Sequence, residues 1–299
     1  MTLSPDQVAL LKIFSKSCRR SILEMVTNAQ SGHPGGSLSC SDFLSLLYTR
    51  RVCETNEPVI VSNGHISPAV YSVLAEFGII PKERVIQTFR KPDDLYEGHV
   101  NRRISGVWYG TGPLGIGSSV AAGLALGKKI QHAQRSEHAK RSEHAKRSEA
   151  FNKEEFVFLL MGDGEQQEGQ VYEMMNFAAK YKLGNLIAFI DENEVQLSDS
   201  LAKIMPMNIR GHYEAAGWHV LMVDGHNFEA LAKALDEAMK ETKRPSVLIA
   251  RTLMGKGVDF MEVAGLAKKA DWHGKAPKKE EAEAALKLLE LSKDEKKIL

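Results

Sequence analysis

Residues 156–169 read FVFLLMGDGEQQEG, so an apolar run leads directly into one carboxylate, Asp163, between two glycines. A short apolar run that ends in glycine is typical of a strand buried on both faces of a parallel sheet. The glycines allow a ligand to approach the main chain, and a helix start after them would offer free N–H groups. This stretch therefore predicts an α/β fold with a ligand-binding edge.

The rest of the chain repeats this pattern. Further apolar runs end in glycine or polar residues at 58–65, 186–193, 218–225 and 246–257, and helical spacing occurs at 8–28, 41–50, 67–78, 169–182 and 227–243. Ser4 or Asp6 is available to cap the first helix, and SGHPGG (31–36) interrupts it. Alternating strands and helices predict a mostly parallel sheet with helices on both faces. We expect all chemically interesting residues at the carboxyl ends of the strands.

Composition narrows the function class. The chain has 299 residues, 43% hydrophobic and 26% charged, and a formal net charge of +1. This near-neutral charge gives no electrostatic case for nucleic acid or a membrane surface. No apolar run approaches the ~20 residues of a membrane span, and the N-terminus lacks the layout of a signal peptide. Cys18, Cys40 and Cys53 show no metal-type pairing, so we expect a cytoplasmic protein with free thiols.

Two segments stand apart from the α/β pattern. Residues 135–149 repeat the unit RSEHAK without an apolar stripe, and helical geometry would point His138 and His144 about 120° apart rather than toward one metal. We expect a solvated insertion, helical or disordered. Residues 279–299 are rich in Lys and Glu and predict a charged helical tail on the surface or on a partner. The remainder, 1–278, is expected to form one domain.

Residues 110–115, GTGPLG, match the G-x-G-x-x-G dinucleotide fingerprint. Pro113 lies inside the turn, and the acid expected about 20 residues later would fall in the polar insertion. The match therefore argues weakly for a nicotinamide cofactor. It still indicates that main chain approaches a ligand closely here.

Asp163 needs a chemical reason. A strand end followed by a helix start favours phosphate, which a carboxylate would repel unless a cation lay between them. Mg²⁺ bridges carboxylates and phosphates in this way. Asn193 ends the next apolar run 30 residues later (193 − 163 = 30), so its side-chain oxygen and the Val195 carbonyl could complete a metal site. Ordinary turn formation by Asp and Asn explains the same residues.

Six stretches resemble one family. GDG followed about 30 residues later by Asn resembles the thiamine diphosphate and magnesium motif. SGHPGG, SNGH, TGPLGIG, GDGEQQEGQVYE, KLGNLIAFIDEN and DWHGKAP are similar, in this order, to blocks of the diphosphate-binding part of transketolase, between about residues 10 and 278. The resemblance implies the thiamine diphosphate-binding fold and ketol transfer from a ketose phosphate to an aldose phosphate.

The resemblance also implies roles for matching positions. Asp163, Asn193 and the Val195 carbonyl would hold Mg²⁺, or Ca²⁺ or Mn²⁺ in its place. His33 and His99 would face the sugar, and imidazole suits proton movement on hydroxyls at neutral pH. His65 and His273, also expected to be catalytic, would lie beside the diphosphate. The other expected cofactor contacts are Gly112, Pro113, Leu114, Gly162, Gly164 and Glu168.

Glu168 and Glu173 correspond to carboxylates that link two active sites at a subunit interface. In the family a further part of the protein carries the catalytic glutamate and much of the sugar pocket. We therefore expect a split enzyme, with a separate subunit supplying the pyrimidine-binding and C-terminal domains in an α₂β₂ assembly. Two alternatives stay open: a 1-deoxyxylulose-5-phosphate synthase-like half, and a non-catalytic paralogue.

The sequence departs from the family in four places. GHV (98–100) replaces GHP, so we expect a reshaped loop at His99. YGTG is expected to bring Tyr109 close to the cofactor, and DEN replaces Asp-Asp-Asn or Asp-Arg-Asn. A longer spacer, residues 263–270, precedes DWHG and affects the placement of His273. His226 also lies beside a glycine at an expected loop end.

Overall fold

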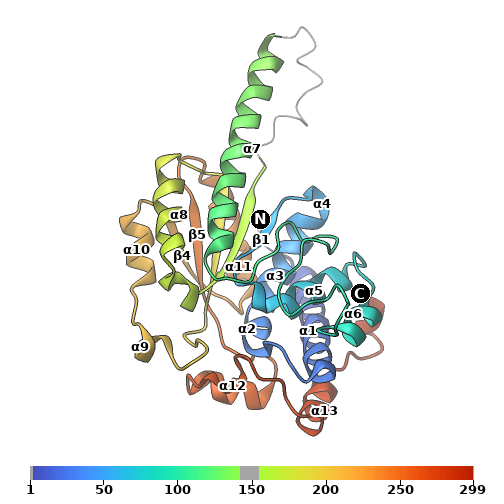
Figure 1. The fold of residues 1–299 in the computed structure, drawn as a ribbon. Coiled ribbons are helices and arrows are strands. Elements are labelled where there is room, and N and C mark those ends of the chain that lie inside the picture. The colour runs from blue at the N-terminus through green and yellow to red at the C-terminus, as the bar shows by residue number, and fades with distance from the viewer. Residues whose placement is uncertain (1–2, 142–154, 299) are drawn as a thin grey trace.

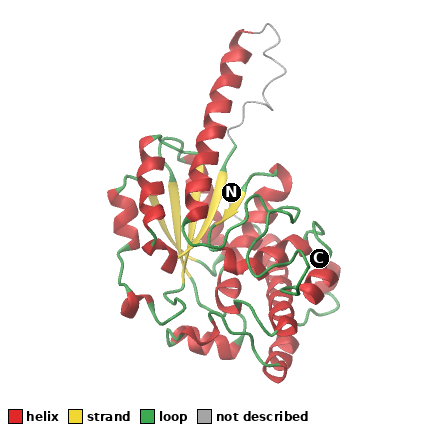
Figure 2. Cartoon of the chain, in the orientation of Figure 1, coloured by secondary structure: helices red, strands yellow, loops and turns green. Residues whose placement is uncertain are grey.

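The computed structural model describes residues 3–141 and 155–298. Its centre is a five-stranded sheet, parallel throughout, in the order β1-β2-β3-β5-β4 (Figures 1 and 2). The apolar runs of the sequence form all of these strands: β1 (Val59–Val61), β2 (Val157–Gly162), β3 (Leu186–Glu192), β4 (His219–Asp224) and β5 (Ser246–Arg251). The predicted parallel α/β fold is therefore confirmed.

Helices cover both faces of the sheet, as Figure 1 shows. Because side chains alternate along a strand, Leu159 of β2 faces one helical layer and Phe158 the other. The first layer consists of α7 (Ile116–Arg141), α8 (Gly169–Lys180) and α10 (Ile209–Ala215). The second layer includes α1 (Pro5–Ala29), α3 (Ser41–Leu47), α5 (Ser67–Glu76) and α11 (Phe228–Lys240). There Phe43 stacks on Phe189 of β3 with ring centroids 3.5 Å apart.

Ser4 is the cap of α1. Its hydroxyl accepts a hydrogen bond from the Gln7 N–H at 3.2 Å, and the Gln7 side chain accepts one from the Ser4 N–H at 2.9 Å. This capping box satisfies N–H groups that the first helical turn cannot pair internally. The helix ends at Gln30, which adopts the left-handed conformation with φ 47°.

Three helical predictions differ from the structure in detail. SGHPGG interrupts the helix only as far as His33, because Pro34 starts α2 (Pro34–Ser39). Proline suits a first helical turn, whose N–H has no partner in any case. The helix expected over 41–50 becomes α3, a π-helical turn at Tyr48–Val52 and the short α4 (Cys53–Thr55). Four further short helices were not predicted: α6 (Lys82–Thr88), α9 (Leu201–Ile204), α10 and α12 (Asp259–Leu266).

The glycine stretch 110–115 does not follow a strand. Residues 89–115 are irregular, and α7 begins directly after them. The dinucleotide fingerprint requires a strand before its glycines, so the structure argues against a nicotinamide site.

The repeat segment and the charged C-terminal segment lie in different parts of the structure. The first residues of the repeat continue α7, which extends beyond the body of the protein in Figure 1. The remainder of the insertion, including His144, lies outside the described residues. At the other end of the chain, α13 (Lys279–Leu288) packs against α1 and buries Ala282 and Ala285; α14 (Glu295–Ile298) follows. The domain boundary at 278 stays a prediction.

Among the described residues, no helix is long and apolar enough to cross a membrane. All three cysteines are free thiols; Cys18 and Cys40 are buried and Cys53 is exposed. Burial raises the pKa of both buried thiols above the usual value, so they act as small core side chains.

Candidate active site

A cleft of about 360 Å³ opens at the carboxyl ends of β1, β2 and β3. It gathers segments from across the sequence, as expected for an open parallel sheet. Pro113 and Glu173 are exposed and do not line it. The other residues expected to be catalytic or to bind the cofactor or the metal do: His33, His65, His99, Gly112, Leu114, Gly162, Asp163, Gly164, Glu168, Asn193, Val195 and His273.

Asp163 follows the last residue of β2 and is only 2% exposed. Its carboxylate accepts hydrogen bonds from the backbone N–H groups of Gly164 at 2.7 Å and Glu194 at 2.5 Å. Within the described part of the chain, no lysine or arginine forms an ion pair with it. Burial, and then the negative charge of Asp191, raises the pKa of Asp163 to about 8. A carboxylate buried beside another one is stabilised by a bound cation.

The end of β3 holds the other half of this arrangement. Asp191 accepts hydrogen bonds from Ser39 at 2.5 Å and Thr252 at 2.6 Å. It also accepts one from the Asn193 side-chain NH₂ at 2.9 Å, while the Asn193 side-chain oxygen accepts the Val195 N–H at 3.0 Å. Burial raises the pKa of Asp191 as well. This network fixes the amide orientation of Asn193, whose oxygen lies in the turn that follows β3.

The residues present fit a hard cation and a diphosphate. No group of three or more His, Cys, Asp or Glu side chains could hold a metal in the parts of the chain that the structure describes. A cation here would therefore use one carboxylate with amide and carbonyl oxygens, which Mg²⁺ accepts when phosphates complete its shell. Asn63 Oδ1 and His33 Nδ1 are buried without a hydrogen-bond partner, and both residues line the cleft. Such atoms are free to bind a polar ligand.

Glycines leave room along the same wall. A Cβ on Gly162 would lie 3.7 Å from its nearest neighbour, the Asn63 side chain, and one on Gly112 would meet nothing within 4 Å. The absence of side chains at these two positions is therefore not required by protein packing. It keeps the cleft open to a ligand.

Four histidine side chains converge on the cleft. The His33 ring centroid lies 5.0 Å from that of His65, 5.8 Å from that of His273 and 6.5 Å from that of His99. The rings of His65 and His273 are 5.4 Å apart. The structure thus brings together the histidines that the sequence selected. It also places His273 firmly in the group despite the longer spacer before it.

These rings are held in the neutral form. Burial, together with the neighbouring imidazoles, lowers the pKa of His33 to about 4 and of His65 to about 3. Burial also lowers the pKa of His99 and of His273. A neutral imidazole has one donor and one acceptor nitrogen, so these rings can both donate hydrogen bonds to sugar hydroxyls and accept hydrogen bonds from them.

Only part of the site comes from strand ends, which corrects the sequence expectation. His65 lies in a 3₁₀ turn just after β1, and Asp163 and Asn193 follow β2 and β3. His33, in contrast, is the residue before α2, and His99 lies in an irregular loop. Helices and loops that fold over the strand ends supply these two side chains. They form the walls of the cleft, and the strand ends form its floor.

The spacer of residues 263–270 lies outside the lining of the cleft and supports the site from beside it. It completes α12 and leads through a short 3₁₀ turn (Ala270–Trp272) to His273. The Lys268 ammonium donates to the Asn193 carbonyl oxygen at 3.3 Å and pairs with Glu194 at 2.6 Å. The spacer therefore braces the turn that carries Asn193.

Val100, which stands where the family has proline, fastens the His99 loop. Its N–H donates to the Gly64 carbonyl oxygen at 3.1 Å, a bond that proline could not make. Tyr71 supports the same loop by donating from its hydroxyl to the His99 carbonyl oxygen at 2.9 Å. Tyr109 does not line the cleft as expected; it packs against the apolar cluster under α7 and α8.

Glu165 is a buried site residue that sequence reasoning missed. Its carboxylate accepts hydrogen bonds from Ser62 Oγ at 2.5 Å, the Gly115 N–H at 2.6 Å and the Gly162 N–H at 3.3 Å. Burial is the main cause that raises its pKa to about 7. One side chain thus joins the ends of β1 and β2 to the loop before α7. The signal was present in GDGEQQEG, but nothing in that stretch shows which glutamate turns inward.

Asn63 and Asp191 were missed for the same reason, since each lies inside a stretch already quoted. Glu168, by contrast, is exposed at the cleft edge. His226 lies elsewhere: its Nδ1 is 2.8 Å from Asp42 Oδ2, and its Nε2 accepts the Leu253 N–H at 2.9 Å. It therefore has a structural position between two loops.

Comparisons with known proteins agree with this geometry. A family model described as the thiamine diphosphate binding domain of transketolase matches residues 12–296. An apulose-4-phosphate transketolase subunit of Phocaeicola vulgatus is 34% identical over 290 residues, covering 94% of each chain. A 6-deoxy-6-sulfo-D-fructose transketolase subunit of a Clostridium species is 32% identical over 254 residues, covering 82% of this chain and 85% of that protein.

Longer relatives match over part of their length. Human transketolase is 33% identical over 291 residues, which cover 93% of this chain and 42% of the human protein. The crystal structure of transketolase from Campylobacter jejuni superposes with a TM-score of 0.80 at 28% identity, covering 96% of this chain and 45% of that one. The resemblance seen in the sequence is confirmed: the chain belongs to the transketolase family, and residues 12–296 match its thiamine diphosphate-binding domain.

Proposed function

We propose that this chain is the diphosphate-binding subunit of a split transketolase. The observation that carries the proposal is coverage: two relatives named as transketolase subunits match along 94% and 85% of their own length. Single-chain transketolases match along less than half of theirs. A second subunit would supply the pyrimidine-binding and C-terminal domains, and we propose an α₂β₂ assembly in the cytoplasm.

The proposed reaction moves a two-carbon ketol unit from a ketose phosphate to an aldose phosphate. Thiamine diphosphate, when bound, supplies the chemistry that carries this unit. Mg²⁺ would be held by Asp163, the Asn193 side-chain oxygen and the Val195 carbonyl. This assignment is supported by the buried, unpaired carboxylate of Asp163 and by the fixed amide of Asn193.

Other residues of the site would position the cofactor and the substrate. Gly162 leaves space for the diphosphate beside Asp163, and Gly164, His65 and His273 would lie next to it. Gly112 and Leu114 would support the aminopyrimidine from the loop that Glu165 holds.

His33 and His99 would contact the sugar hydroxyls. Their lowered pKa values leave both rings neutral at pH 7, where one ring nitrogen can accept a hydrogen bond from a hydroxyl and the other can donate one. Glu168, exposed at the edge of the cleft, would contact the partner subunit.

Reconstitution tests the proposal. The purified chain, given thiamine diphosphate and Mg²⁺, is expected to show no ketol transfer from a ketose phosphate to ribose 5-phosphate. Addition of a subunit carrying the pyrimidine-binding domain should start turnover. Robust turnover by the chain alone would refute the split architecture. If the assembled enzyme used pyruvate as donor and ignored ketose phosphates, the synthase alternative would replace the proposal.

A further inference from the structure

Arg90, just beyond α6, adopts an unusual backbone conformation. Its φ is 58°, in the left-handed region that a side chain other than glycine, asparagine or aspartate rarely occupies. Its N–H donates to the Tyr96 carbonyl oxygen at 2.8 Å and closes the loop between them. Strained residues of this kind persist where surrounding contacts hold them, often near functional sites.

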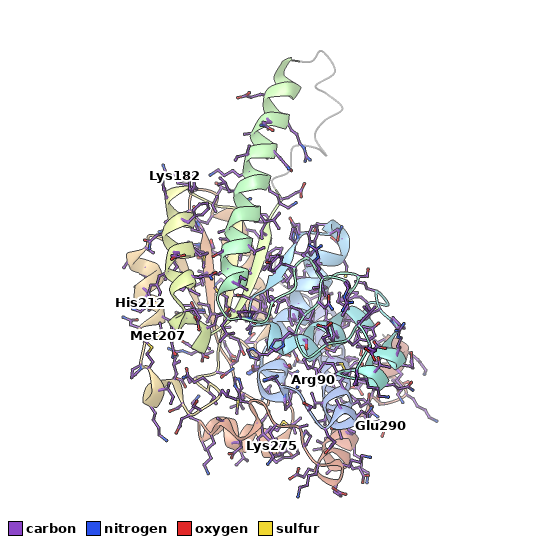
Figure 3. All side chains as sticks on the ribbon, in the orientation of Figure 1. Arg90, Lys182, Met207, His212, Lys275 and Glu290 are labelled. Atoms are coloured by element: carbon purple, nitrogen blue, oxygen red, sulfur yellow. The ribbon has the colours of Figure 1, made fainter. Side chains whose placement is uncertain are left out.

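The Arg90 side chain contacts two separate loops, and Figure 3 labels it between the regions of α6 and α2. Its Nη1 donates to Ser31 Oγ at 2.7 Å, two residues before His33. Its guanidinium also lies against Gly98, directly before His99: a Cβ at Gly98 would be 2.3 Å from Nε. One rigid, planar group therefore spans the two segments that carry these histidines.

Arg90 has no compensating negative partner within ion-pair distance among residues 3–141 and 155–298. Arg84, on the preceding helix α6, shows such pairing, since it pairs with Asp94 at 3.3 Å. The charge of Arg90 is therefore left to act on the histidines nearby.

We propose that Arg90 is a positioning residue of the site, which sets the separation of His33 and His99 and places a permanent positive charge beside both rings. The inference rests on the proposed function, in which these two histidines contact the sugar. It adds a residue outside the cleft lining to the machinery that orients the substrate.

The electrostatics of the two rings agree with this role. The pKa of His33 is lowered by burial first, then by His273, Arg90 and His99; the ring of His65 also faces it. The pKa of His99 is lowered by burial and then by Arg90, while Glu97 acts in the opposite direction. A fixed cation beside an imidazole disfavours its protonated form.

The other two histidines provide an internal control. Arg90 is not among the causes that lower the pKa of His65 or of His273. Loss of the charge should therefore raise the pKa of His33 and His99 without raising that of His65 or His273. General loosening of the fold would instead move all four values toward that of exposed histidine.

Histidine titration by NMR on the full chain, without substrate, tests the proposal. In Arg90→Met the pKa values of His33 and His99 should rise, while those of His65 and His273 should not rise. Arg84→Met, which removes the same charge from the preceding helix α6, should leave all four pKa values unchanged. Unchanged values for His33 and His99, or an equal rise of all four, would overturn the proposal.

Two further variants separate charge from geometry and remain useful if Arg90→Met does not fold. Arg90→Lys keeps the charge but cannot span both loops, and Gly98→Ala forces the guanidinium away. Each should lower kcat/KM of the assembled enzyme about 10- to 100-fold, since small misplacements of reacting groups have effects of this size.

In Arg90→Lys the histidine pKa values should stay low, and the KM for the ketose should rise more than kcat falls. Wild-type kcat/KM in both variants would refute the positioning role. If the wild-type assembly showed no ketol transfer at all, the proposed function would fail, whereas the titration result would still stand by itself.

Discussion

The backbone N–H of Asp163 donates to the carbonyl oxygen of Asp191 at 3.3 Å, so two buried carboxylates sit at adjacent strand ends. Within the described residues, no lysine or arginine pairs with either one. Hydroxyls and amides stabilise Asp191, but Asp163 has only two backbone N–H groups. The two residues therefore differ in role: Asp191 orients Asn193, and Asp163 is available to a cation.

Replacement of Asp163 tests this division. Asp163→Asn in the assembled enzyme should weaken Mg²⁺-dependent binding of thiamine diphosphate by about 100-fold or more, because even residues outside a metal's ligand set contribute 10- to 100-fold. Isothermal titration calorimetry with and without Mg²⁺ measures the effect. Asp294→Asn, at an exposed position near the C-terminus, is the matched control. Unchanged affinity in Asp163→Asn would remove it from the metal site.

Two glycines should respond in opposite ways to the same change. A Cβ at Gly162 would lie 3.7 Å from its nearest neighbour, the Asn63 side chain. Gly162→Ala should therefore leave the midpoint of thermal unfolding nearly unchanged but weaken cofactor binding. A Cβ at Gly64 would lie 2.3 Å from Thr111 Oγ1. Gly64→Ala should therefore lower the free energy of unfolding by about 1–3 kcal/mol and lower the melting temperature. Melting curves and cofactor titrations on both variants check this. Equal destabilisation of the two variants would contradict the conclusion that the cleft wall has free space at Gly162.

The histidine cluster should make the chain sensitive to acid. The pKa of His33 in the folded chain, about 4, lies below its usual value of 6.5. The contribution of His33 to the free energy of unfolding is therefore fully present above pH 6.5 and is lost as the pH falls toward 4. Asp163 and Glu165, whose pKa values are raised, act in the opposite sense, so wild type must be compared with a variant.

His33→Gln isolates the histidine contribution. The difference in unfolding free energy between wild type and His33→Gln should shrink by about 1–2 kcal/mol between pH 7.5 and 4.5. Urea unfolding at several pH values measures it. A difference that does not vary with pH would show that the His33 ring titrates normally.

Glu165 should be important for stability. Glu165→Ala leaves the donors of Ser62, Gly115 and Gly162 without their acceptor, at a cost of roughly 3 kcal/mol or more. Glu165→Gln should cost less, because one amide oxygen still accepts while the NH₂ faces a donor. Urea denaturation of these variants, with the exposed Glu168→Ala as control, gives the ranking. A wild-type midpoint for Glu165→Ala would show that water replaces the carboxylate.

Substitutions at Val100 test whether its hydrogen bond to Gly64 stabilises the loop that carries His99. Val100→Pro removes the N–H that donates to Gly64 and should destabilise the chain by about 1 kcal/mol. Val100→Thr keeps the N–H and a similar shape, although it buries a hydroxyl. If the proline variant were as stable as wild type, the Val100–Gly64 bond would have no role in stability.

Local pattern was sufficient for the framework and for part of the site. The strands were identified because each is a short apolar run that ends in glycine or a polar residue. Asp163 and Asn193 could be paired because neighbouring parallel strands bring their carboxyl ends to one edge. Both conclusions depend only on chain order and periodicity. The left-handed turn at Arg90 and the inward turn of Glu165 leave no such signature.

The parallel sheet, the edge at which ligands bind and the family follow from residue type and residue order. Which side chains meet at that edge depends on the folded chain. His33, His65, His99 and His273 come together, and Arg90 reaches both Ser31 and Gly98, through packing between residues far apart in the chain. Contacts of that range are set by how helices and loops settle on the strand ends, which no local pattern encodes.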